Sequence, residues 1–475
     1  MLFRSGAPAL RAISRASGSS STLPRSLPRS LHFSSPPQAP NPSSRSESAW
    51  AAATESAHSV LTPPPSSAAR HDPLAAIHAE IGSLKDSLFQ LLGSSHPALD
   101  TIAKYYFHAE GKHLRPLIVL LMSQATNGLA GPGWTRAREE ALAQSVDDSL
   151  TVEGGVLNDW NPEVSGRESG AVTFGEPFRI PNLAPLPPRL KPTLQSLQTS
   201  LDDGSPQILP TQRRLASITE MIHVASLLHD DVIDTSPLRR GQPSAPNEFG
   251  NKLSILSGDF LLGRASVALA RLGSREVVEL LATVIANLVE GEVMQLRATS
   301  EPERIPTKKG FEDYMRKTYL KTASLMAKSA RAAVILGGSG RGEAEWVKEV
   351  AYGYGRNLGI AFQLVDDALD FLPPDLSLGK PGEGADLKLG LATAPALFAW
   401  EEHPELGPLI LRKFSESGDV KMARDIVGRS KGLERTMDLA RKFAGEARGM
   451  AERLPESEAR GALVGLTEKV VDRVK

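Results

Sequence analysis

Apolar residues recur along most of the chain at three- and four-residue intervals, the spacing that places them on one face of a helix. No segment shows the convincing apolar–polar alternation of a strand. Helices without a sheet to pack on bury their apolar faces against one another, so the pattern predicts an all-α protein, a single large helical bundle around a central cavity. The helical spacing covers the ranges 74–92, 98–107, 116–124, 212–234, 252–272, 274–299, 310–336, 343–372 and 394–402, and several stretches nearer the C-terminus.

Three segments interrupt the helical pattern. Residues 1–46 contain six arginines and many serines but no acidic residue, which is typical of a mitochondrial transit peptide; a disordered basic tail is the alternative. Residues 47–72 are rich in Pro, Ser and Ala without periodicity and are predicted to be a disordered linker. Residues 127–205 are rich in Gly, Pro, Ser and Asp and are predicted to be an insertion that loops out of a domain spanning residues 73–475.

Two aspartate clusters follow apolar, helix-like runs: residues 230–234 read DDVID and residues 366–370 read DDALD. Aspartates at i and i+4 lie about 40° apart on a helix and one turn along, so their charges face the same way and repel. A divalent cation removes that cost, and Mg²⁺ prefers carboxylates that it shares with substrate phosphate oxygens. One cluster is equally well explained as a solvated helix end, but two with the same spacing favour magnesium-dependent diphosphate chemistry.

Basic residues accompany the aspartates, as a bound diphosphate requires: Arg239 and Arg240 follow the first cluster, and residues 111–116 read GKHLRP. The formal net charge of −1 argues against a nucleic-acid partner or a polybasic membrane anchor. The absence of cysteine excludes disulfides, thiolate metal sites and a catalytic thiol. No unbroken apolar run reaches the length of a membrane span, and no GxxxxGK[ST] loop supports nucleotide hydrolysis.

Together these motifs resemble those of the trans-isoprenyl diphosphate synthases. The chain is most similar to the fungal mitochondrial long-chain polyprenyl (hexaprenyl, solanesyl or decaprenyl) diphosphate synthases of ubiquinone biosynthesis. The resemblance covers residues 76–126 and 208–475 and implies a prenyltransferase of the isoprenoid synthase fold, with residues 73–475 as the catalytic domain. The motifs occur in the family's order: GKHLRP at 111–116, LLHDDVID at 227–234, RRG at 239–241, GDFLL at 258–262, EGE at 290–292, KT at 321–322, FQLVDD at 362–367, GKP at 379–381 and DLKLGLATAP at 386–395.

The resemblance implies a site for two diphosphates, with Mg²⁺, up to three ions, as the cofactor. The magnesium ligands would be Asp230, Asp234 and Asp366, with Asp231, Asp367 and Asp370 completing the shells directly or through water. The allylic diphosphate, whose carbon–oxygen bond breaks, would be bound by Arg239, Lys321, Thr322, Gln363 and Lys380, with Gln363 near the developing carbocation. The expected catalytic residues are Asp230, Asp234, Asp366, Lys321, Arg239 and Gln363.

A second cationic pocket, for isopentenyl diphosphate, is implied at Lys112, Arg115, Arg240 and His223. His223 precedes Asp230 by seven residues, so it lies on the carboxylate face about 10 Å along the helix; a core histidine is the alternative. No side chain suggests itself as the base that removes the proton, and the family implies released pyrophosphate instead. Terpene cyclases share the fold and one aspartate motif but lack this pocket.

Ser226 and Ala225 stand four and five positions before the first aspartate, where short-chain members of the family carry bulky aromatics. A long product, from hexaprenyl to decaprenyl, is therefore expected. The alternatives are small residues that only allow helices to pack, a geranylgeranyl diphosphate synthase, and a subunit that needs a heteromeric partner. The family also implies a farnesyl or geranylgeranyl starter, a homodimer or heteromer with a related subunit, and a mitochondrial matrix location, where peripheral contact with the inner membrane is open.

Overall fold

The computed structural model describes residues 96–108, 113–143, 208–239, 241–300, 305–339, 344–372 and 384–472, together with Ser94, Val146 and single positions between 81 and 92. The predicted transit peptide at 1–46, the linker at 47–72 and most of the insertion at 127–205 lie outside these residues. So do Lys112, Arg240 and Lys380. What the sequence predicts for them stays a prediction.

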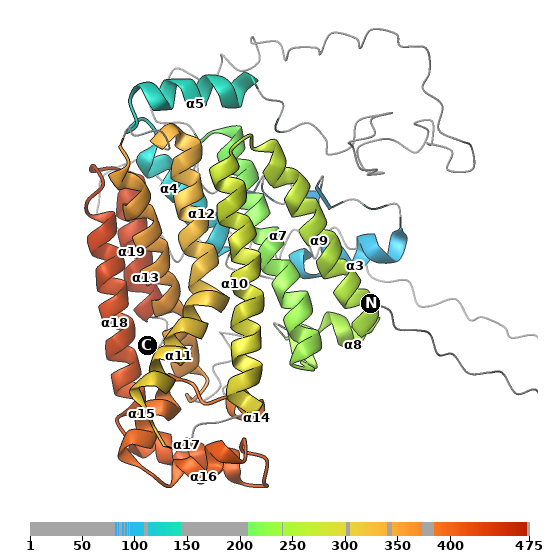
Figure 1. The fold of residues 1–475 in the computed structure, drawn as a ribbon, viewed down its shortest axis with the longest axis vertical. Coiled ribbons are helices and arrows are strands. Elements are labelled where there is room, and N and C mark those ends of the chain that lie inside the picture. The colour runs from blue at the N-terminus through green and yellow to red at the C-terminus, as the bar shows by residue number, and fades with distance from the viewer. Residues whose placement is uncertain are drawn as a thin grey trace, which may run out of the picture. The chain divides into compact units, whose positions relative to one another are not determined.

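The described chain is largely helical, as the apolar spacing predicts, and its long helices lie side by side in one bundle (Figure 1). The first half contains α3 (Pro97–His108), α4 (Leu114–Thr126), α5 (Pro132–Ala143), α7 (Pro210–Ile233), α8 (Ala245–Phe249), α9 (Asn251–Arg271) and α10 (Arg275–Ser300). The second half contains α11 (Lys308–Thr318), α12 (Ser324–Val334), α13 (Trp346–Leu369), α14 (Ala385–Lys388), α15 (Ala394–Glu402), α16 (Leu406–Leu411), α17 (Asp419–Arg429), α18 (Gly432–Ala451) and α19 (Glu458–Asp472). The strands found in the described ranges are β1 (Leu238–Arg239) and β2 (Gln242–Pro243), a short antiparallel pair.

The helix predicted over 310–336 is interrupted by π-helical turns. It consists of α11, the π-turn η3 (Tyr319–Ala323), α12 and the π-turn η4 (Ile335–Ser339). Gly338 in η4 has a φ of 93°, a value that a residue with a Cβ rarely adopts, and it ends the helical path. Single π-turns inside α-helices often mark functional sites, and the site residues Lys321 and Thr322 lie in η3.

Helix α4 forms part of the centre of the bundle. Its residues from Pro116 to Ser123 are all buried, and it packs on α7, α12 and α19. A helix that is apolar on every side has no solvent face and must lie in a core. Each fully buried leucine there contributes about 1.5–3 kcal/mol relative to an exposed one, so α4 stabilises the arrangement of the helices around it.

Helices α12 and α13 approach closely because α13 has glycines where they meet. A Cβ at Gly355 would lie 2.5 Å from the carbonyl oxygen of Met326, and a Cβ at Gly359 would lie 2.6 Å from the Cα of Ala323. Gly359 lies one turn after Gly355, so the contact continues along α13 towards the second aspartate cluster. This contact holds the end of α13 beside the π-turn η3.

Two buried amides hold the base of the predicted insertion. Asn127 Nδ2 donates to Gln212 Oε1 at 2.9 Å, and Gln212 Nε2 donates to Asn127 Oδ1 at 2.8 Å and to the Ala333 carbonyl at 2.9 Å. After Asn127 the chain forms α5, which packs on η4. The interpretation of residues 127–205 as an irregular insertion did not include this helix, although the run of Arg, Glu and Ala in it favours helix.

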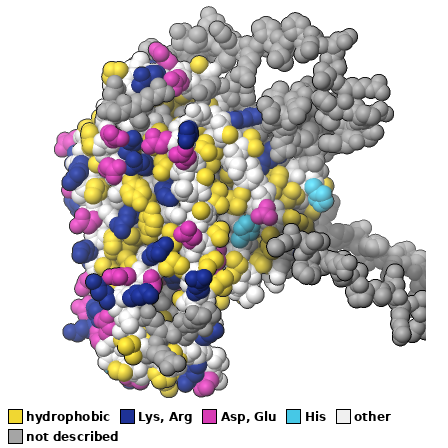
Figure 2. All heavy atoms as spheres, viewed as in Figure 1, with side chains coloured by type: hydrophobic (Ala, Val, Ile, Leu, Met, Phe, Trp, Pro, Cys, Tyr) yellow, Lys and Arg dark blue, Asp and Glu magenta, His cyan; other side chains and the backbone are white. Residues whose placement is uncertain are grey.

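Helix α10 presents a stripe of apolar side chains on the outside of the described bundle. Val289, Val293 and Leu296 are spaced four and three residues apart and are 61%, 45% and 53% exposed. Ile255 and Leu256 of α9 are exposed as well, and Figure 2 shows hydrophobic side chains over this face. By length and composition α9 could cross a membrane, with 44% of its apolar window buried in the bundle. A search for an unbroken apolar run misses α9 because polar residues interrupt it.

Candidate active site

The two aspartate clusters lie at the C-terminal ends of α7 and α13. Asp230 is in the last turn of α7, and Asp234 caps that helix by donating its N–H to the Asp230 carbonyl at 2.8 Å. Asp366 lies in the last turn of α13, and Asp370 caps it. The C-terminus of a helix carries partial negative charge, so carboxylates there are unfavourable until a cation compensates them. The arrangement therefore suits the binding of cations.

The second aspartate of the first cluster, Asp231, is turned into the protein and is fully buried. Arg239 Nε donates to its two oxygens at 3.0 and 3.2 Å, and Arg239 Nη2 forms an ion pair with Oδ1. The hydroxyl of Tyr106 donates to Oδ2 and accepts the N–H of Ala245 at 2.8 Å. Asp231 therefore joins α3, α7 and β1, which corrects the prediction that it completes a magnesium shell.

The second cluster repeats this arrangement with different partners. Asp367 is 3% exposed, its Oδ2 accepts the hydroxyl of Tyr314 at 2.5 Å, and its Oδ1 accepts Gln363 Nε2 at 2.8 Å. The oxygens of Asp370 accept two backbone N–H groups at the start of α14, at 2.9 and 3.1 Å. The metal-ligand prediction is corrected for these two residues as well, because protein groups hold their carboxylates.

Lys321 lies on η3 and is held by α10. Its Nζ forms an ion pair with Glu292 and donates to Gln295 Oε1 at 3.2 Å; Glu292 and Gln295 are 8% and 9% exposed. A Cβ at Gly291 would lie 2.6 Å from Lys321 Cγ, so glycine leaves room for the lysine. This explains the middle residue of the EGE motif. Glu292 and Gln295 are residues of the site to which the sequence analysis assigned no role.

Thr322, the next residue of η3, is bonded to α13. Its Oγ1 donates to Gln363 Oε1 at 2.8 Å, and Gln363 Nε2 in turn donates to Asp367. The amide of Gln363 is therefore oriented at both ends. Consecutive residues of one π-turn reach two different helices, so η3 joins the first cluster to the second.

Negative charge exceeds positive charge around the first cluster. Burial raises the pKa of Asp230 to about 6, and the charges of Glu292 and Asp234 raise it further against the opposing Lys321 and Arg239. Burial also raises the pKa of Asp234. The pKa of Lys321 is raised because these carboxylates outweigh its burial. Within the described ranges no three His, Asp or Glu side chains could hold a metal ion by themselves, which fits Mg²⁺ that also takes phosphate oxygens.

The structure brings two of the residues predicted for isopentenyl diphosphate into contact. Arg115 Nη1 of α4 lies 3.0 Å from His223 Nε2 of α7, although 108 residues separate them. A guanidinium has only donors, so His223 Nε2 accepts this hydrogen bond. The other two, Lys112 and Arg240, belong to the part of the chain that the structure does not describe.

The two small residues predicted to line the product pocket differ in their surroundings. Ala225 is buried in the core at 1% exposure. Ser226 is half-buried, and its Oγ donates to the His223 carbonyl at 2.8 Å. Asp230 lies one turn beyond Ser226 on the same face of α7. Ser226 is therefore the better placed of the two to meet a chain that grows from the carboxylates.

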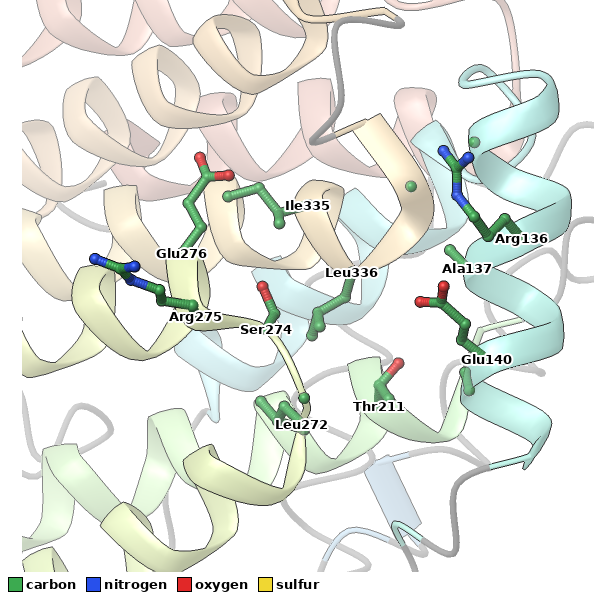
Figure 3. Close-up of a pocket in the computed structure, with 14 residues that line it drawn as sticks. Arg136, Ala137, Glu140, Thr211, Leu272, Ser274, Arg275, Glu276, Ile335 and Leu336 are labelled. Atoms are coloured by element: carbon green, nitrogen blue, oxygen red, sulfur yellow. The ribbon is translucent and has the colours of Figure 1, made fainter.

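A cavity of about 390 Å³ lies near the other end of α7 (Figure 3). Thr211 lines it and precedes Asp230 by 19 residues, roughly 28 Å along the helix. Charged side chains such as Arg136, Glu140 and Arg275 also line it. Distance and charge separate this cavity from the aspartate site.

Comparison with known proteins agrees with this geometry. Residues 189–427 match the family described as polyprenyl synthetase. A Neurospora crassa protein, a probable mitochondrial hexaprenyl pyrophosphate synthase, is 48% identical over 91% of this chain and 90% of its own length. The chain belongs to the polyprenyl synthetase family. Decaprenyl-diphosphate synthase subunit 1 of Schizosaccharomyces pombe is 42% identical over 84% of this chain and 90% of its own.

A solved polyprenyl synthase has the same fold. The Caulobacter crescentus enzyme, complexed with calcium and isoprenyl diphosphate, is 26% identical with a TM-score of 0.61, and the match covers 86% of this chain and 99% of that one. Membership of the polyprenyl synthetase family confirms the predicted fold class and prenyltransferase activity, and this protein is a long-chain polyprenyl diphosphate synthase. The roles of individual residues in this polyprenyl synthetase rest on the geometry described above.

Tyr314→Phe is expected to lower the unfolding free energy of this polyprenyl synthetase by about 1–3 kcal/mol, because the buried carboxyl of Asp367 loses a donor. Urea unfolding followed by circular dichroism in EDTA measures the change. Tyr352→Phe is the matched control, since its hydroxyl meets only the hydroxyl of Tyr319 at 2.8 Å, and about 0.5–1.5 kcal/mol is expected. Equal losses in the two variants would show that Asp367 does not depend on Tyr314.

Proposed function

We propose that the protein adds isopentenyl diphosphate repeatedly to farnesyl or geranylgeranyl diphosphate, in a Mg²⁺-dependent reaction, to make the hexaprenyl-to-decaprenyl precursor of the ubiquinone side chain. The observation that carries the proposal is the buried cluster in which the carboxylates of Asp230, Asp234 and Glu292 surround Lys321. A second carboxylate cluster on α13 and the separate Arg115–His223 pair provide for two diphosphates. Only a reaction with two anionic substrates uses all three groups.

In the proposed reaction Asp230, Asp234 and Asp366 hold Mg²⁺, which takes up the charge that develops on the departing diphosphate. Calcium in the Caulobacter crescentus enzyme supports an oxygen-ligated divalent cation. Lys321 is preoriented by Glu292 and adds a fixed positive charge beside the same oxygens. Because Lys321 does not have to reorganise during the reaction, its charge lowers the barrier to ionisation.

The remaining side chains are proposed to place the two organic groups. The oriented amide of Gln363 lies between Thr322 and Asp367, where a partial negative charge stabilises a nearby carbocation. Arg115 and His223 receive the diphosphate of isopentenyl diphosphate, with Lys112 and Arg240 as further proposed partners. The departing pyrophosphate takes the proton that the condensation releases. Arg239 acts chiefly by holding Asp231, and Lys380 remains a proposed allylic-diphosphate ligand.

Residues 1–46 are proposed to direct the protein to the mitochondrial matrix. The basic, acid-free composition supports this, as does the mitochondrial Neurospora crassa relative. Such a hydrophobic product favours release at the inner membrane, so peripheral contact with that membrane is part of the proposal.

A second copy of this chain is the proposed partner of the apolar face of α9 and α10. The three- and four-residue spacing of Val289, Val293 and Leu296 suits packing against another helix. Large exposed apolar faces mark interaction sites in proteins. The name of the Schizosaccharomyces pombe relative, subunit 1, supports a related but different subunit as the alternative.

The full chain, supplied with farnesyl diphosphate, labelled isopentenyl diphosphate and Mg²⁺, is expected to give a ladder of products that ends between hexaprenyl and decaprenyl, measured by mass. Asp230→Ala and Asp366→Ala are expected to lower kcat by about a hundredfold to a thousandfold. Asp438→Ala, on the surface of α18, is the control and should leave kcat unchanged. Products that stop at geranylgeranyl would identify the shorter-chain alternative, and activity only after adding mitochondrial extract would show that a partner subunit is required.

Ser226→Phe is expected to shorten the product while turnover is retained, because an aromatic ring one turn before Asp230 would block the growing chain. The same mass measurement tests this. Ser226→Ala is the matched control and should keep the product length. The original expectation for Ala225→Phe is weaker, since Ala225 lies in the packed core and a ring there costs stability. An unchanged ladder from Ser226→Phe would rule out this position as a determinant of length.

Val293→Glu is expected to convert the proposed dimer to a monomer, because the interface would bury an unpaired charge. Sedimentation velocity measures the mass of the particle. Ile305→Glu is the control, because Ile305 is 66% exposed but lies outside the α10 stripe. If the two variants have the same mass as the parent, this face is not the interface.

A further inference from the structure

A buried carboxylate lies beside the cationic pocket proposed for isopentenyl diphosphate. Glu220 is 3% exposed and lies on α7, three residues before His223 and therefore on nearly the same face. A negative charge near the binding site of a diphosphate should repel the substrate. Its position is intelligible only if the carboxylate organises the cations that receive the substrate.

Glu220 contacts the start of the segment that carries Arg115. Its Oε1 lies 3.2 Å from His113 Nδ1 in a pair that is buried on both sides. His113 caps α4 with φ 39° and ψ 36°, a left-handed conformation that a side chain with a Cβ rarely adopts. Such conformations persist where the surroundings hold them in place. The contact with Glu220 supplies that restraint.

The geometry of His113 decides where Arg115 lies. Arg115 is the second residue of α4, and its guanidinium meets His223 at 3.0 Å. Glu220 and His223 thus contact His113 and Arg115 respectively, so two residues of α7 meet two residues at the start of α4. A shift of His113 would move Arg115 away from His223.

The charges agree with this geometry. Burial alone would raise the pKa of Glu220, but the hydrogen bond from His113 and the nearby charges of His113, His223 and Arg115 lower it to about 2. The carboxylate therefore remains ionised at neutral pH. It balances the cations while no diphosphate is bound, so they can stay clustered in a partly dry pocket.

We propose that Glu220 is a positioning residue for isopentenyl diphosphate: through His113 it holds the start of α4 so that Arg115 and His223 face the same diphosphate. Glu220 itself does not touch the substrate. The inference rests on the proposed function, because it presumes that Arg115 and His223 bind isopentenyl diphosphate.

Glu220→Gln keeps the size of the side chain and removes the charge. The KM for isopentenyl diphosphate should rise about tenfold to a hundredfold, the effect of losing a charge-assisted hydrogen bond, while kcat and the KM for farnesyl diphosphate change little. Calorimetric titration of the full chain with isopentenyl diphosphate in EDTA should show the same loss of affinity without turnover or metal. Glu220→Asp, which keeps the charge, should recover part of it.

A double-mutant cycle tests whether Glu220 acts through His113. His113→Asn is suitable because asparagine tolerates the left-handed conformation. If the two residues act as one unit, the double variant should bind isopentenyl diphosphate no more weakly than the weaker single variant. Tyr354→Phe is the matched control: it removes a buried hydrogen bond, from the hydroxyl to the Leu463 carbonyl at 2.8 Å, and should leave both KM values unchanged.

Arg115→Ala separates failure of this inference from failure of the proposed function. If Arg115→Ala raises the KM for isopentenyl diphosphate and Glu220→Gln does not, the pocket stands and the role of Glu220 is overturned. If Arg115→Ala leaves that KM unchanged, the pocket is wrongly placed and the inference falls with it. Equal increases of both KM values in Glu220→Gln would show a general loss of structure and would also overturn the role.

Discussion

Two buried carboxylates, Asp231 and Asp367, hold the site in register. A carboxylate leaves water only when donors replace the lost solvation, and each of these has a tyrosine hydroxyl and a second donor in place. Because the second aspartate of each cluster is fixed in this way, the first aspartate of that cluster is held at a defined position on its helix. Metal binding thus depends on residues that do not themselves face the metal.

The same principle of charge compensation extends through the site. Lys321 is paired with Glu292, and the cations at the start of α4 lie beside Glu220. Cations clustered in a partly buried pocket would repel one another without these partners. Catalysis by fixed charges requires that the charges be in place before the substrate arrives, because reorganisation during the reaction would cost the stabilisation they provide. The buried acids therefore prepare positive charge for anionic substrates.

The fold contributes two local features that bring these charges together. Gly355 and Gly359 let α13 approach α12 and η3 closely. The π-turn η3 then gives two consecutive residues, Lys321 and Thr322, different directions of approach. An unbroken α-helix also separates consecutive side chains, by about 100°, but the π-turn adds a residue to the turn and changes where the following helix faces. The two halves of the site are therefore linked through one short segment.

The sequence by itself determined the class of the fold, because the three- and four-residue apolar spacing is a local property that survives without coordinates. It also determined the chemistry, since two equal aspartate clusters with basic residues nearby suit few ligands other than magnesium diphosphates. It could not show that Asp231 and Asp367 turn inwards, because their tyrosine partners are 125 and 53 residues away. Nor could it assign Glu292, Gln295 and Glu220, whose roles depend on contacts between helices. Spacing along one helix defines which residues share a face, but only the packing of helices decides which of them meet a partner, a metal or the substrate.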